Sequence, residues 1–164
     1  MALLDIQSPS SGPLNNGMTF FALAFRPFFF MAGLSAVLLM ALWLVIYRGL
    51  VPAPDYYGAI AWHGHEMLFG YAAAVVVGFL LTATKNWTGI QTLRYGPLAG
   101  LTLAWVLGRL VPFVPGLSPS AIALIDMLFL PLAAVALAFP LFQSRQKHNI
   151  PLAFLVLALA LANG

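Results

Sequence analysis

Two histidines and a glutamate lie together in the segment WHGHE, residues 62–66, at the head of a long apolar run that extends to residue 83. Ionisable side chains are costly near hydrocarbon, and those found there usually bind or transfer something. Imidazole is also a common protein ligand of metal ions and of haem iron. The segment therefore predicts a metal or haem site held inside a membrane.

The two imidazoles point in different directions if this segment is a regular helix. At about 100° per residue, His63 and His65 lie about 200° apart, so they cannot bind one iron from the same helical face. We expect them to serve different partners, such as a haem and a second metal. The same helix carries a ridge of small residues, which permits close approach of another helix or of a flat macrocycle; the ridge consists of Gly70, Ala74 and Gly78.

Two other interpretations of the histidines stay open at this point. Gly64 lies between them and could let the first helical turn unwind, which would bring both imidazoles to one site. The histidines could instead be interfacial polar groups beside an aromatic belt, which in this chain would contain Tyr56, Tyr57 and Trp62.

Three further ionisable side chains share one level of the predicted membrane. With a helical rise of about 1.5 Å per residue, Glu66, Arg109 and Asp126 all fall in the outer third, close to the histidines. We expect one polar cluster, in which Arg109 pairs with Asp126 or Glu66 or holds a haem propionate. The alternative is that each side chain lies at the interface and reaches the headgroups.

The composition excludes a water-soluble fold. Hydrophobic residues make up 62% of the 164 positions and charged residues 7%, whereas a soluble domain has about 25% charged residues. Cysteine is absent, which excludes disulfides, thiolate metal sites, iron–sulfur clusters and covalent c-type haem. We expect membrane lipid as a partner and no nucleic acid, because in such a chain the cations report topology.

Apolar runs of about 20 residues predict an all-α, polytopic transmembrane helix bundle in residues 26–164, after a flexible tail in residues 1–25. Four complete spans are expected at about residues 28–47, 59–83, 97–111 and 120–142. A fifth begins near residue 150 and is still apolar at residue 164. We therefore expect the chain to be a fragment of a longer protein.

The lysines and arginines in the short loops predict the orientation of the bundle. One side carries the cations at positions 26, 85, 94, 145 and 147, and the other carries Arg48 and at most Arg109. Because cationic loops stay in the cytoplasm, we expect a cytoplasmic N-terminus. The WHGHE segment then lies near the outer, periplasmic-type face.

The order and spacing of four motifs resemble the NnrS family. These motifs are FRPFF at residues 25–29, WHGHEMLFG at 62–70, GFLLTA at 78–83 and NWTG at 86–89. Family members are polytopic proteins of the bacterial inner membrane, described as containing haem and copper and linked to the nitric oxide response and denitrification. Full members look about twice as long as this chain, with roughly twelve spans of about 20 residues each, so this chain would be the N-terminal part.

The resemblance implies a haem b and copper site, with His63 and His65 as the leading ligands and Glu66 in or beside the coordination sphere. Arg109 would contact the haem, and Asp126 would belong to the supporting polar cluster. Further ligands would come from the missing C-terminal spans or from other membrane subunits. Nitric oxide could be sensed, sequestered or converted at such a site, and no catalytic activity is assigned.

Two other classes of function remain open on the sequence. The intramembrane charges could line the path of a small-molecule or proton transporter. Alternatively, the chain could be a membrane assembly subunit without a cofactor, in which the two histidines are interfacial.

Overall fold

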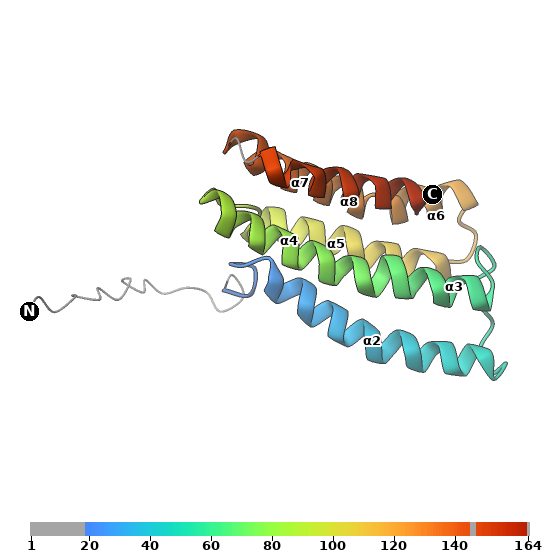
Figure 1. The fold of residues 1–164 in the computed structure, drawn as a ribbon. Coiled ribbons are helices and arrows are strands. Elements are labelled where there is room, and N and C mark those ends of the chain that lie inside the picture. The colour runs from blue at the N-terminus through green and yellow to red at the C-terminus, as the bar shows by residue number, and fades with distance from the viewer. Residues whose placement is uncertain (1–18, 145–146, 164) are drawn as a thin grey trace, which may run out of the picture.

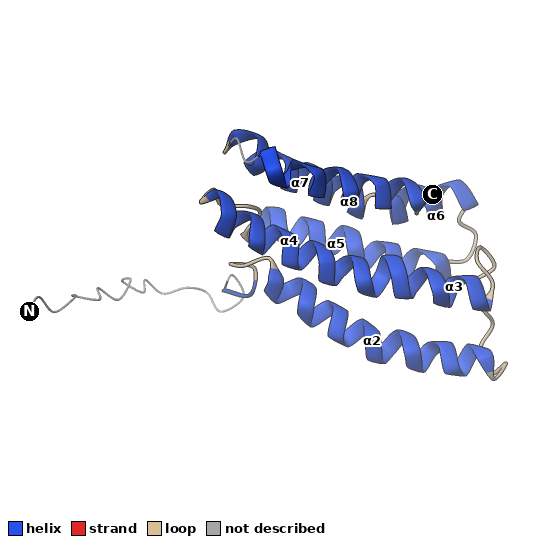
Figure 2. Ribbon diagram, viewed as in Figure 1, coloured by secondary structure: helices blue, strands red, loops and turns tan. Residues whose placement is uncertain are grey.

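The computed structural model describes residues 19–144 and 147–163, and in this part of the chain every regular element is a helix (Figure 2). The expected all-α class is confirmed. The α-helices are α2 (Phe25–Tyr47), α3 (Ala59–His65), α4 (Ala73–Thr88), α5 (Tyr95–Leu110), α6 (Pro119–Met127), α7 (Phe129–Gln143) and α8 (Ile150–Ala162). Three short segments complete them: the π-helical η1 (Glu66–Ala72) and the 3-10 turns η2 (Val111–Phe113) and η3 (Lys147–Asn149).

The long helices run side by side as a bundle (Figure 1). Helix α2 lies at one side of it and α7 with α8 at the other, while α4 lies between them and contacts both α2 and α7. The short apolar helix α8 packs along α7. Four continuous helical stretches are long and apolar enough to cross a membrane, namely Phe25–Tyr47, Ala59–Thr88, Tyr95–Phe113 and Pro119–Gln143.

The second span extends beyond its expected end at residue 83. The hydroxyl of Thr82 donates to the carbonyl of Gly78 at 2.9 Å. Thr88 likewise donates to the carbonyl of Thr84 at 2.7 Å. Because these hydroxyls bond back to their own helix, they do not interrupt it. The helix ends at Gly89, whose φ of 70° is a left-handed conformation that glycine adopts without steric strain.

Residues 19–25, expected as part of a flexible tail, pack against the bundle instead. Ala24 is buried in the main core, and the side chain of Phe21 packs against that core. The backbone N–H of Tyr95 donates to the carbonyl of Phe21 at 2.7 Å. Burial of these apolar groups offsets the entropy lost when the segment is ordered. The rest of the expected tail, residues 1–18, lies outside the described residues.

Helices α2 and α4 approach each other closely at Gly78. A Cβ atom at this position would lie 2.7 Å from the Cβ of Phe28, whose side chain is fully buried. The ring of Phe28 also packs against Phe129 of α7, with ring centroids 5.6 Å apart. The ridge of small residues therefore meets another helix at this point, and one aromatic side chain joins three helices.

We expect Gly78→Ala to lower the free energy of unfolding by about 1–3 kcal/mol, because the added methyl group forces α2 away from α4. Gly100→Ala in α5 is the matched control, since it adds the same methyl group where no atom lies within 4 Å. Unfolding in detergent micelles, followed by tryptophan fluorescence, measures the difference. Equal stability of the two variants would contradict the close approach.

Candidate functional site

Both histidines of the WHGHE segment lie on one continuous helix, Ala59–Thr88. Gly64 lies inside α3, and the helix continues through it without unwinding. Directly after His65 the helix widens into the π-helical segment η1, a feature found frequently at functional sites. The unwound arrangement that would bring both imidazoles together is therefore not the one adopted.

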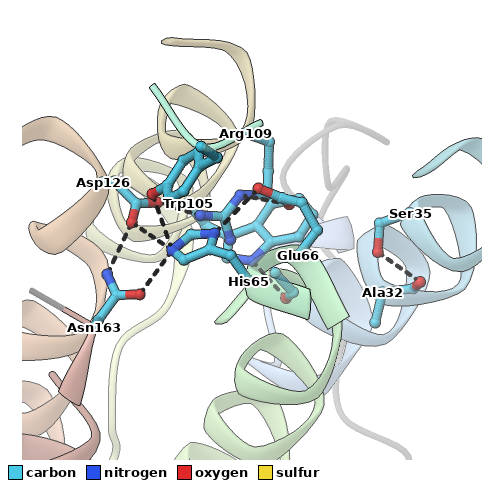
Figure 3. Close-up of polar contacts among 10 residues, drawn as sticks. Ala32, Ser35, His65, Glu66, Trp105, Arg109, Asp126 and Asn163 are labelled. Atoms are coloured by element: carbon cyan, nitrogen blue, oxygen red, sulfur yellow. Dashed lines mark hydrogen bonds and ion pairs between the residues drawn. The ribbon is translucent and has the colours of Figure 1, made fainter. Parts of the chain in front are cut away.

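The imidazole of His65 lies between two carboxylates and an amide (Figure 3). Its Nδ1 is 3.4 Å from Oε1 of Glu66, and its Nε2 is 3.0 Å from Oδ2 of Asp126. The same Nε2 lies 2.9 Å from Oδ1 of Asn163 and 3.2 Å from the hydroxyl of Tyr57. Both ring nitrogens of His65 thus face polar atoms of the protein.

Arg109 reaches the same two carboxylates from α5 (Figure 3). Its Nε lies 3.0 Å from Oε2 of Glu66, and its Nη2 pairs with Oδ1 of Asp126. The side chain of Glu66 is fully buried, and those of Arg109 and Asp126 are nearly so. The pairing expected for Arg109 with one of the two carboxylates is present with both. We call His65, Glu66, Arg109, Asp126 and Asn163 the polar cluster.

Two glycines make room for the polar cluster. A Cβ atom on Gly70 would lie 2.6 Å from Oε2 of Glu66, and one on Gly108 would lie 2.8 Å from Oδ1 of Asp126. The indole N–H of Trp105 donates to the carbonyl of Gly70 at 3.0 Å, which ties α5 to the π-helical segment. Gly70 therefore lets the carboxylate of Glu66 lie against the backbone of its own helix, and Gly108 lets that of Asp126 lie against the backbone of α5.

Sequence reasoning missed two residues that contact His65. Asn163 directly follows α8, 98 residues from His65, and its Nδ2 donates to Oδ2 of Asp126 at 2.8 Å. The one sequence signal for it was a polar residue at the end of an apolar run. Tyr57, which was assigned to an interfacial belt, lies in the loop before α3. Burial raises the pKa of its phenol well above the usual range, so the hydroxyl stays protonated.

His63 faces away from the polar cluster, toward α2. Its ring stacks on that of Trp43, with centroids 4.3 Å apart and an interplanar angle of 26°. Its Nδ1 is buried and has no hydrogen-bond partner among the described residues. Because an unpartnered buried polar atom costs about 1–3 kcal/mol, this nitrogen is a candidate position for a ligand. The two imidazoles diverge, as their spacing on a regular helix predicts.

The polar cluster is an ion-pair network in this structure. Within residues 19–144 and 147–163, no three His, Cys, Asp or Glu side chains are arranged to hold a metal ion. Both carboxylates that a metal could use are in contact with the guanidinium of Arg109. The contacts within the cluster hold α3, η1, α5, α6 and the end of α8 together.

A protein-family model described as "NnrS protein" matches residues 19–164. The match extends well beyond the four motifs in residues 25–89 and covers all of the helices described above. Searches of curated proteins and of solved structures gave no match.

We expect Arg109→Leu to lower the free energy of unfolding by about 3–5 kcal/mol, because it removes the guanidinium that pairs with two buried carboxylates. Arg48→Leu is the matched control, because Arg48 is exposed at the end of α2 and exposed substitutions change stability by about 0.5 kcal/mol or less. Both variants are compared with the parent protein by unfolding in detergent. A similar small effect of the two substitutions would show that the cluster does not hold the bundle together.

Proposed function

Because this chain belongs to the NnrS family, we propose that it is a haem- and copper-binding integral membrane protein of the nitric oxide response. Two observations already limit the range of possible functions. The match over residues 19–164 and the four membrane-length helices identify a polytopic membrane protein. Membership of the family suggests a role in the response to nitric oxide. The cofactors are the part that we propose.

The observation that carries the cofactor proposal is the state of His63. Its Nδ1 is buried and lacks a hydrogen-bond partner among the described residues, and imidazole nitrogen is a suitable ligand for haem iron or copper. His63 would hold the group, and the stacked ring of Trp43 would fix the plane of the imidazole. Haem iron and copper, when bound, supply centres that bind nitric oxide.

One imidazole is not a complete coordination sphere. Among the described residues, no group of three or more His, Cys, Asp or Glu side chains could hold a metal ion, with His63 or without it. We therefore propose that further ligands come from additional membrane spans or from another subunit.

We expect the protein purified from its native membrane to contain haem b and copper, and His63→Ala to lower the content of at least one of them about tenfold or more, as loss of a metal-site residue commonly does. A pyridine haemochrome spectrum and elemental analysis measure both contents per protein. His148→Ala is the control, because His148 is exposed and lies between α7 and α8. The absence of both haem and copper from the parent protein would refute the proposal.

We further propose that the protein resides in the bacterial inner membrane with its N-terminus in the cytoplasm. Arg26 lies at the start of α2, while Lys85 and Arg94 lie around the end of α4 and the start of α5; these ends share one side of the bundle (Figure 1). Arg48 lies at the opposite end of α2. Arg109 does not count as a loop cation, because it is held within the polar cluster. Without it, the difference in loop cations between the two sides of the bundle is larger than the sequence alone suggested.

Single cysteines test this orientation, because the chain has none of its own. We expect Asp55→Cys, in the loop between α2 and α3, to react with a membrane-impermeant maleimide in spheroplasts. Asn86→Cys, exposed near the other end of the bundle, should react only after the membrane is permeabilised. The reverse labelling pattern would place the N-terminus outside the cytoplasm.

A further inference from the structure

We infer that the two histidines of the WHGHE segment have separate roles: His65 is an internal clamp that holds the bundle together, and His63, which lies outside the polar cluster, is the one that binds an external ligand. The clamp follows from the contacts of the polar cluster. The statement that a metal or haem would bind at His63 rests on the proposed function.

The Nε2 of His65 is occupied by contacts within the protein, while its Nδ1 faces the carboxylate of Glu66 without forming a hydrogen bond. A metal ion binds imidazole in the ring plane at about 2.0–2.1 Å from the nitrogen. At Nε2, oxygens of Asp126 and Asn163 already lie at 3.0 and 2.9 Å, and Glu66 faces Nδ1 at 3.4 Å. Coordination would therefore require these contacts to be broken inside a membrane, where their loss is costly.

The contacts of His65 also join distant parts of the chain. Asp126 belongs to α6, and Asn163 follows α8, so one imidazole connects α3 to both. Asn163 completes a closed set of contacts, because its Oδ1 faces His65 while its Nδ2 donates to Asp126 at 2.8 Å. This arrangement fixes the rotation of α3 about its own axis.

The rotation of α3 determines the direction in which His63 points. It precedes His65 by two positions on the same helix and therefore points about 200° away from it. The clamp on one side of α3 thus holds His63 against Trp43 on the other side, where the rings stack at 4.3 Å. His65 is a positioning residue for His63.

The test uses His63→Ala, His65→Gln and Asn163→Ala in the full-length protein, with haem and copper content and apparent melting temperature measured for each. We expect His65→Gln and Asn163→Ala to lower the melting temperature, and their effects to be non-additive in the double variant because they break the same contacts. Both should retain haem and copper, and if the group at His63 is haem, its Soret band should shift because His63 is displaced. We expect His63→Ala to lose cofactor and to regain it when free imidazole is added.

Two results would overturn the assignment. The first is loss of haem or copper in His65→Gln while Asn163→Ala keeps both, which would make His65 a ligand. The second is an unchanged melting temperature in Asn163→Ala, or additive effects in the double variant, which would remove the clamp. If His65→Gln does not accumulate, Asn163→Ala alone decides the second point. A parent protein without haem and copper would refute the proposed function, and the melting temperatures would still decide the clamp.

Discussion

The guanidinium of Arg109, buried between the carboxylates of Glu66 and Asp126, is the interaction on which the arrangement of this bundle depends. Charges inside a membrane persist only where they are paired, so the three helices that carry them must meet at one level and in one rotation. Gly70 and Gly108 follow from this constraint, because a side chain at either position would occupy the space of a carboxylate oxygen. The apolar contacts of the core then fill the remaining volume.

The same constraint separates the two histidines. His65 lies on the face of α3 that turns toward Asp126, and its contacts there belong to the ion-pair network. His63 is turned toward α2, where its ring meets Trp43 and its Nδ1 finds no partner among the described residues. Two residues that look equivalent in the sequence therefore lie in different surroundings: His65 lies within the ion-pair network and His63 lies outside it.

The different surroundings of His63 and His65 bear on the role in the nitric oxide response that membership of the NnrS family suggests. For the cofactor site that we propose, the ion-pair network on one side of α3 would fix the position of the helix, and His63 on the other side would hold the group. Charged residues make up only 7% of the chain, yet several of them are buried. The ion-pair network explains this, because the buried charges pair with one another.

The sequence by itself determined the all-α class and the membrane spans, because apolar runs of about 20 residues allow little else. It also determined that the imidazoles diverge and that Glu66, Arg109 and Asp126 share a level, since helical rise and rotation are fixed quantities. The tertiary structure decided that Arg109 contacts both carboxylates, that the helix passes through Gly64 intact, and that Asn163 reaches His65 across 98 residues. The physical reason is that helical periodicity is local, whereas the rotation and docking of one helix against another depend on side-chain contacts between residues far apart in the chain.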